Sequence, residues 1–335
     1  MTGHVAIVGA TGAVGQEFLS ILAERKFPVG KITFLASSRS AGKTVEFCGK
    51  QHTIEELTES SFVGVDLALF SAGGGISKKF APIAAKAGAT VVDNSSAFRM
   101  DPQTPLVVPE VNPEDIARHN GIIANPNCST IIAVVPVFAL YKHNRVERMV
   151  VSTYQAASGA GYRAMLELEQ QTRDVLEGKP AKREAFPHQI AFNLFCHDSA
   201  IGSDGYNTEE TKLVNETRKM FHDPDILISA TCVRVPVMRA HSEAINLTFA
   251  KPITEREARE ILSAAPGVQV VDDRAGNHFP MPIETSGGDD VLVGRIRQDV
   301  SQPDGRGIDM FICGDQLRKG AALNAIQIAE LLNGK

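Results

Sequence analysis

Short apolar runs alternate with longer amphipathic stretches over the first third of the chain. Four apolar runs have the length and composition of buried strands: His4–Val8, Lys31–Ala36, Val65–Phe70 and Thr90–Asp93. Apolar residues at helical spacing follow the first and the third run, over residues 16–25 and about 77–87. Strands that alternate with helices are typical of a parallel sheet covered by helices, so this pattern predicts an α/β domain.

A glycine-rich turn joins the first strand to the first helix. It reads Gly9-Ala10-Thr11-Gly12-Ala13-Val14-Gly15, a glycine spacing typical of dinucleotide-binding turns. The glycines permit a tight turn and a close approach to the pyrophosphate, which rests on the helix N-terminus. A plain strand-to-helix turn is the alternative, but the position at the start of an alternating pattern favours a cofactor. We predict a Rossmann-type dinucleotide-binding domain with five cofactor-binding residues in this turn: Gly9, Thr11, Gly12, Ala13 and Val14.

The residues after the second strand indicate which cofactor is bound. A NAD-binding domain usually carries an acidic residue there, whereas this chain reads Ser37-Ser38-Arg39-Ser40. An arginine flanked by hydroxyl groups suits the 2′-phosphate of NADP. We predict that Arg39 and Ser40 bind this phosphate. The alternative is that Arg39 is a solvated loop charge.

The segment Asn125-Pro126-Asn127-Cys128-Ser129-Thr130 stands between a strand-like run, 122–124, and a helix-like run, 131–140. Cys128 is therefore expected in the first turn of a helix, where backbone N–H groups and the helix dipole favour a thiolate. A thiolate is the nucleophile that covalent catalysis needs. A free cysteine is more often a small buried hydrophobe. Here the polar neighbours would be poor core residues, which favours a catalytic Cys128.

Arg99 follows the fourth strand, after Asn94-Ser95-Ser96-Ala97-Phe98. Ligands of open parallel sheets bind beyond the carboxyl ends of the strands. We therefore predict that Arg99 binds an anion, the alternative being an ordinary surface arginine.

The pattern changes beyond Leu140. Strands are predicted over residues 146–157, 231–237, 244–249, 291–297 and 307–313, and helices over 162–177, from 208, and over 254–264. This half is expected to be α+β, with helices on one face of a mixed or antiparallel sheet. Glu209 and Lys212 share a helix face because they lie three residues apart, and a solvated pair is the alternative. A last helix, from about Arg318 to Leu332, has an apolar stripe that we expect to pack on the first domain.

The composition of the chain limits which binding partners and which cellular location are expected. The net charge of -5 and the lack of a Lys/Arg-rich block argue against nucleic acid and anionic membranes. No apolar run approaches the roughly 20 residues of a membrane span, and the start lacks a signal-peptide layout, so the cytoplasm is the expected location. The five cysteines have no close pairs, which fits reduced thiols and neither a disulfide framework nor a metal site.

Together these motifs resemble the aspartate-β-semialdehyde dehydrogenases over nearly the whole chain. The resemblance rests on the glycine turn, the segment around Cys128, Gln155-Ala156-Ala157-Ser158-Gly159-Ala160-Gly161, Glu209 to Lys212, and Arg234 followed seven residues later by His241. It implies an NADP(H)-dependent enzyme that interconverts 4-phospho-L-aspartate and L-aspartate 4-semialdehyde plus phosphate through a cysteine thioester. It also implies a homodimer and a place in lysine, diaminopimelate, threonine, methionine and isoleucine biosynthesis.

The resemblance implies roles for single residues. Cys128 is expected to be the nucleophile, His241 the acid/base, and Gln155 the residue that positions the substrate and the intermediate. A histidine near neutral pKa fits a proton transfer with the thiohemiacetal hydroxyl. The other implied contacts are the substrate's carboxylate and amino ends for Arg234 and Glu209, phosphate for Arg99 and Lys212, and the cofactor for Ser158, Gly159 and Gln316.

The predicted domains are an NADP-binding domain over residues 1–127, completed by a helix over 315–335, and a catalytic and dimerisation domain over 128–314. Two other functions are alternatives to that of an aspartate-β-semialdehyde dehydrogenase. N-acetyl-γ-glutamyl-phosphate reductase uses the same cysteine chemistry, but a free α-amino group needs a carboxylate, and Glu209 favours aspartyl substrates. A cofactor-binding homologue without catalysis would lack the nucleophile or the base, and both are present.

Overall fold

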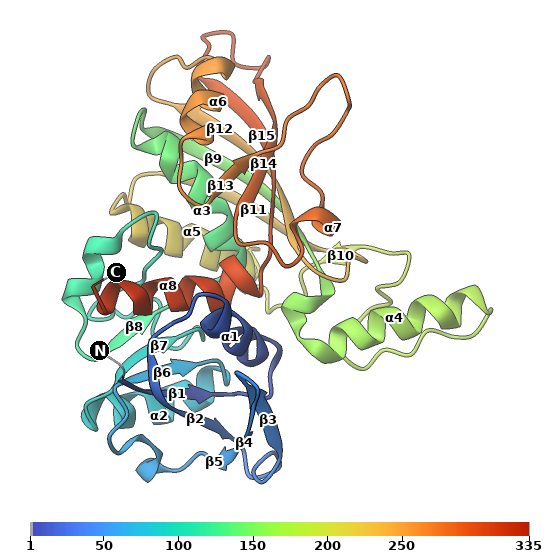
Figure 1. Ribbon diagram of the computed structural model, residues 1–335. Coiled ribbons are helices and arrows are strands. Elements are labelled where there is room, and N and C mark those ends of the chain that lie inside the picture. Colours follow the sequence, from blue (N-terminus) through green and yellow to red (C-terminus); the bar gives the residue numbers. More distant parts are fainter. Residues whose placement is uncertain (1–2, 335) are drawn as a thin grey trace. The chain divides into compact units, whose positions relative to one another are not determined.

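The computed structural model describes residues 3–334 and divides the chain into two compact units. The first unit contains the described residues up to Asn127 and those from Ala321 onwards, and the second is Cys128–Gly320. Each unit has its own sheet and its own helices (Figure 1). No helix in the described part of the chain is long and apolar enough to cross a membrane.

A six-stranded parallel sheet forms the centre of the first unit, in the order β5-β2-β1-β6-β7-β8. Its strands are β1 (Gly3–Val8), β2 (Val29–Ala36), β5 (Glu55–Glu56), β6 (Leu67–Phe70), β7 (Thr90–Asp93) and β8 (Ile122–Ala124). The helices are α1 (Ala13–Glu24) and α2 (Gly74–Lys86), with 3-10 turns at Glu59–Phe62 and Pro113–Arg118. The parallel order, with strands added on both sides of β1, confirms the predicted Rossmann-type fold.

A small hairpin of β3 (Thr44–Phe47) and β4 (Lys50–Thr53) was not predicted. Its residues are mostly exposed and polar, and Val45 alone is buried, so no apolar run marked it. The ring of Phe34 in β2 contacts Phe47 and His52 of the hairpin edge to face. The hairpin is thus held by aromatic contacts that join residues distant in sequence.

The last helix of the chain, α8 (Leu323–Leu332), belongs to the first unit although it follows the whole second unit in sequence. Ile326 and Ala329 lie in one buried cluster with Phe18 and Leu22 of α1. Arg25 at the end of α1 forms an ion pair of 2.6 Å with Glu330 of α8. One π-helical turn, Arg318–Ala322, precedes α8, so the predicted single helix is two segments of different winding.

The second unit is built on a seven-stranded mixed sheet in the order β10-β11-β9-β12-β15-β14-β13. The strands are β9 (Val146–Gln155), β10 (Phe195–Cys196), β11 (Leu227–Arg234), β12 (His241–Phe249), β13 (Val268–Val270), β14 (Val291–Gln298) and β15 (Gly307–Gly314). The helices are α3 (Cys128–Tyr141), α4 (Tyr162–Leu176), α5 (Thr208–Phe221), α6 (Glu255–Ser263) and the short α7 (Pro282–Thr285), with a 3-10 turn at Ala157–Ala160. The predicted helix over 208 begins after Asn207, whose side chain accepts the N–H of Glu210 in a capping box.

Alternate residues of β9 and β12 are buried, and α3 packs on this sheet together with α5 and α6 (Figure 1). The residues that alternate with the buried ones along these strands, such as Val150, Ser152 and Ala244, border a shallow pocket on the opposite face of the sheet. This arrangement confirms the predicted α+β domain with helices on one face of a mixed sheet. The covered face is the one that carries the candidate site.

Glu243 of β12 points into the covered face and is fully buried. Among the described residues neither of its carboxylate oxygens has a hydrogen-bond partner. Burial raises the pKa of Glu243 well above its usual range, so the folded protein holds a neutral carboxyl group. The unfolded chain ionises this group near pH 4.5, and folding must then take up a proton.

We expect this carboxyl group to lower stability as the pH rises. Because its folded-state pKa is raised, Glu243 contributes to the free energy of unfolding in full below about pH 4.5. This contribution is lost as the pH rises through the folded pKa, by up to about 1.4 kcal/mol per pH unit. Glu243→Gln should therefore lose less stability than the wild type between pH 5 and pH 8 in urea unfolding. Glu260→Gln, at an exposed helix position, is the matched control. Parallel curves for Glu243→Gln and the wild type would contradict a neutral Glu243.

Candidate active site

Cys128 is the first residue of α3, as the segment around it predicts. Its side chain is half-buried, and its Sγ lies 3.7 Å from Nε2 of His241. The first-turn N–H groups of a fourteen-residue helix and its dipole stabilise a negative charge at this position. The structure thus places a thiol that is biased towards thiolate beside a histidine ring.

His241 begins β12 and is completely buried. Its Nδ1 accepts the backbone N–H of Ala156 at 3.0 Å. Because a backbone N–H can only donate, Nδ1 is unprotonated and the neutral ring carries its proton on Nε2, the nitrogen that faces Cys128. Burial, followed by the nearby positive charge of Arg234, lowers the pKa of His241 to about 3. The resting ring is therefore a neutral hydrogen-bond donor towards the sulfur.

Three of the predicted residues stand in one row across the sheet. Gln155 of β9 pairs with Arg234 of β11. On the other side of β9, Ser242 pairs with Tyr154, which places His241 opposite Gln155. Side chains in one row of a sheet project to the same face about 5 Å apart. Pairing of three strands therefore gathers the histidine, the amide and the guanidinium, which are up to 86 positions apart in sequence.

Gln155 connects this row to the helices above it. Its Nε2 lies 2.9 Å from Oγ of Ser129 in α3 and 3.5 Å from Oε1 of Glu209 in α5. Its Oε1 accepts Nη1 of Arg234 at 3.3 Å. The buried amide is therefore held by donors and acceptors from three elements, as a residue that positions a substrate needs to be.

Glu209 and Lys212 form an ion pair of 3.0 Å on α5. The Glu209 side chain is only 6% exposed, which excludes the alternative of a solvated surface pair for the carboxylate. Asn207 and the capping box fix the first turn of α5, so the direction of Glu209 is set locally. The pair brings one negative and one positive charge to the site.

The predicted cofactor residues of the second unit surround His241. A Cβ added to Gly159 would lie 2.9 Å from Cε1 of His241 and 3.4 Å from Nη1 of Arg234, so this position has room only for glycine. Nε2 of Gln316 donates to Oγ of Ser158, and Oε1 of Gln316 accepts the N–H of Ala240 at 2.9 Å. These residues thus support the loop that leads into His241.

The other cysteines differ from Cys128 in their surroundings. Burial raises the pKa values of Cys232 and Cys313 to about 12, which keeps both as inert thiols. Cys48 lies in the turn between β3 and β4, Cys196 lies in β10, and both are exposed. Within the described residues, Cys128 is the cysteine that combines a helix N-terminus with a histidine partner.

The glycine turn of the first unit fits a dinucleotide. Gly9 has φ +92, and a Cβ there would lie 2.2 Å from the carbonyl oxygen of Ser71, so no other residue is accommodated. Gly12 precedes α1 without a side-chain cap, which leaves first-turn N–H groups for a phosphate. Thr11 is exposed beside this turn, and Ala13 and Val14 begin α1. A cradle of this kind can hold the pyrophosphate of a nicotinamide dinucleotide.

Arg39 and Ser40 lie in the turn after β2, and Arg39 is exposed. Arg99 is instead buried: its Nε donates to the carbonyl of Asn125 at 2.9 Å and its Nη2 to that of Asn94 at 2.9 Å. The ordinary surface arginine weighed as an alternative is therefore excluded for Arg99. Both arginines belong to the first unit.

Sequence reasoning missed the segment His197–Ser199, which lies beside the row of site residues. His197 is buried, and burial followed by the charge of Arg234 lowers its pKa. Asp198 contacts Arg234, and Ser199 contacts the first turn of α5. The only signal in the sequence is a cluster of polar residues in a loop-rich stretch, which is too common to single out these three.

Two family models match this chain. A family model described as "Semialdehyde dehydrogenase, NAD binding domain" matches residues 4–119, and one described as "Semialdehyde dehydrogenase, dimerisation domain" matches residues 137–319. An aspartate-semialdehyde dehydrogenase from Synechocystis is 57% identical over 98% of this chain and 97% of its own length. The chain belongs to the aspartate-semialdehyde dehydrogenase family.

Two further members of the aspartate-semialdehyde dehydrogenase family extend the comparison. The enzyme from Aquifex aeolicus is 55% identical over 98% of this chain and 97% of its own length. A crystal structure of aspartate semialdehyde dehydrogenase II from Vibrio cholerae, complexed with ASA, has a TM-score of 0.96 at 46% identity and covers 100% of this chain and 99% of that one. The family resemblance stated from the sequence is confirmed.

Proposed function

We propose that this chain is an aspartate-semialdehyde dehydrogenase that reversibly reduces 4-phospho-L-aspartate to L-aspartate 4-semialdehyde and phosphate. The observation that carries the proposal is the pair Cys128 and His241, with Sγ and Nε2 3.7 Å apart at the N-terminus of α3. This pair stands beside one carboxylate and one guanidinium, Glu209 and Arg234, which suit the amino and carboxylate ends of an aspartyl group. The reaction belongs to the synthesis of lysine, threonine, methionine and isoleucine.

In the reductive direction, the Cys128 thiolate attacks the acyl carbon of the substrate and phosphate leaves, which gives a thioester on sulfur. A nicotinamide cofactor, when bound beside the glycine turn, would supply the hydride that this reduction needs. The acid/base role expected of His241 is revised here: because its pKa is lowered to about 3, we propose that near neutral pH it acts as a hydrogen-bond donor, through Nε2–H, to the oxygen on which negative charge develops. Collapse of the tetrahedral adduct then expels the thiolate and releases the aldehyde. Gln155 holds the carbonyl group, while Arg99 and Lys212 are proposed to bind phosphate.

The direct test is a spectrophotometric assay with aspartate semialdehyde, phosphate and each nicotinamide cofactor. Reduction of the cofactor that requires phosphate would support the proposal. A chain that instead acts on N-acetyl-glutamate semialdehyde would support the reductase alternative, in which the substrate has no free amino group for Glu209.

A nicotinamide cofactor is expected from the family, and we propose NADP on the basis of Arg39. This guanidinium is exposed after β2, and among the described residues it has no hydrogen bond or ion pair. Arg39→Glu should weaken NADP binding by about 100-fold and NAD binding much less, because a charge-assisted contact becomes a repulsion. KM values for both cofactors, with Lys43→Glu as a control of the same charge change, measure this. Equal losses for NADP and NAD would contradict the assignment.

We further propose a homodimer located in the cytoplasm. The family model over residues 137–319 is described as a dimerisation domain. The uncovered face of the seven-stranded sheet, with Val150, Ala244 and Phe311, is a surface of the second unit that a second copy can cover. Light scattering of the purified chain measures the mass of the assembly.

A further inference from the structure

The segment His197–Ser199 follows β10. It contacts one strand and one helix of the substrate site, β11 and α5. The N–H of His197 donates to the carbonyl of Cys232 at 2.8 Å, which extends the pairing of β10 with β11. The N–H of Glu209 donates to Oγ of Ser199 at 3.2 Å. The segment is therefore fixed to the two elements that carry Arg234 and Glu209.

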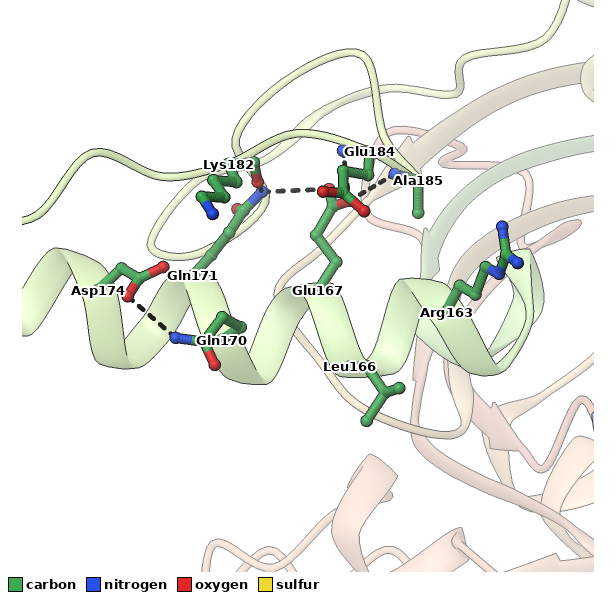
Figure 2. Close-up of a pocket in the computed structure, with 9 residues that line it drawn as sticks. All are labelled: Arg163, Leu166, Glu167, Gln170, Gln171, Asp174, Lys182, Glu184 and Ala185. Atoms are coloured by element: carbon green, nitrogen blue, oxygen red, sulfur yellow. Dashed lines mark hydrogen bonds between the residues drawn. The ribbon is translucent and has the colours of Figure 1, made fainter.

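The chain before this segment is anchored on α4 (Figure 2). The carboxylate of Glu167 accepts the N–H groups of Glu184, Ala185 and Phe186. Gln171 donates to the carbonyl of Lys182 at 2.6 Å and accepts the N–H of Ile190 at 2.9 Å. These contacts surround a pocket of about 520 Å³ whose polar groups largely satisfy the protein's own backbone. The side chains of Glu167 and Gln171, which line the pocket, thus hold the segment that leads to β10.

Asp198 forms an ion pair with Arg234, with its Oδ1 3.2 Å from Nε. The Arg234 side chain is 7% exposed and that of Asp198 23%. Gln155 holds Nη1 of the same guanidinium, and within the described residues Nη2 has no hydrogen bond. Asp198 therefore occupies one edge of the guanidinium and leaves its terminal edge for a substrate carboxylate.

Two ion pairs, Arg234 with Asp198 and Lys212 with Glu209, are linked by Gln155, which bonds to both Arg234 and Glu209. Within these two pairs the charges balance. The two histidines that face them, His197 and His241, both have lowered pKa values and are neutral near pH 7. Without Asp198 the two pairs would keep one net positive charge.

We propose that Asp198 is a specificity-determining residue that matches the site to a zwitterionic α-amino acid semialdehyde. The inference rests on the proposed function. It gives a physical reason why the enzyme discriminates against semialdehydes that lack the α-ammonium group. A substrate with both an ammonium and a carboxylate is neutral at this end and fits two ion pairs whose charges balance. A substrate with the carboxylate alone brings an extra negative charge next to Asp198, where it is repelled.

The test compares aspartate semialdehyde with 4-oxobutanoate, the same semialdehyde without the amino group, at saturating phosphate and NADP. Asp198→Asn removes the negative charge and keeps the size of the side chain. We expect the ratio of kcat/KM for aspartate semialdehyde over 4-oxobutanoate to fall by about tenfold, which lies between the values for one charge contact in bulk water and at a protein surface. Asp198→Ser should move the ratio in the same direction.

Asp204→Asn is the matched control, because Asp204 lies in the same loop, is exposed and, among residues 3–334, accepts a hydrogen bond only from the N–H of Tyr206. A ratio within twofold of the wild type in both Asp198 variants would overturn the proposal. Equal losses of kcat/KM on both substrates would also overturn it, because they indicate a merely structural role. A wild-type chain that is inactive on aspartate semialdehyde would overturn the proposed function and this inference with it.

Discussion

Replacing Cys128 with serine should lower turnover by about three orders of magnitude or more while cofactor binding is retained. The helix N-terminus favours a thiolate at this position, and a hydroxyl group is a far weaker nucleophile at neutral pH. Steady-state rates with aspartate semialdehyde and fluorescence titration with NADPH measure the two quantities. Incubation of the wild type with 4-phospho-aspartate in the absence of NADPH should also add an aspartyl mass to the peptide that contains Cys128.

Cys196→Ser is the control for the loss of a thiol, since Cys196 is exposed in the edge strand β10. It should keep nearly full turnover. Cys232 and Cys313 are unsuitable nucleophiles because burial raises their pKa values to about 12. Substantial activity in Cys128→Ala, or an acyl group on any other cysteine, would refute the covalent mechanism.

Replacing His241 with alanine should lower kcat by about 100- to 1,000-fold, which is the size of effect seen when a hydrogen-bond donor to a developing negative charge is removed. His241→Gln should be at least tenfold more active than His241→Ala. Its side-chain amide can place an N–H near the position of Nε2, whereas it cannot take up a proton at neutral pH. The prediction follows from the bond between the N–H of Ala156 and Nδ1, which leaves the ring proton on Nε2.

The dependence of kcat/KM on pH shows whether His241 acts as a hydrogen-bond donor or as a base. With a folded pKa of about 3, His241 is neutral throughout the range from pH 5 to pH 8, so it should cause no inflection in kcat/KM there. Arg234, Glu209 and His197 are the charged or titratable groups that influence it, and each is part of the same site. An inflection between pH 5 and 8 that disappears in His241→Gln, or equal activity of the glutamine and alanine variants, would show that His241 acts as a base in the rate-limiting step.

The local parts of this site could be predicted from sequence. The apolar run, glycine turn and helix around Gly9 form a contiguous pattern, and the same holds for the helix start at Cys128. Asn207 and Thr254 are capping residues that lie next to the helices they begin. Such features depend on residues that are neighbours in the chain, so the physical cause is visible in the sequence.

The relation between Arg234, Gln155 and His241 depends on strand register instead. β9 pairs parallel with β11 and antiparallel with β12, and a shift by one residue in either pairing would turn a side chain to the other face. No local sequence pattern encodes that register. In the sequence, only the family resemblance indicates that these three residues belong to one site. Asp198 was missed for the same reason, because its contact with Arg234 follows from the pairing of the two-residue strand β10.

The return of α8 to the first unit has a consequence for synthesis on the ribosome. Ile326, Ile328 and Ala329 fill the cluster around Phe18 and Leu22, so the amino-terminal unit cannot complete its core when it is translated. It must wait for residues 128–320, whose synthesis takes roughly 10 to 40 s at 5–20 residues per second. During that interval the apolar side of α1 is exposed, and the nascent chain is most prone to aggregate or to bind a chaperone.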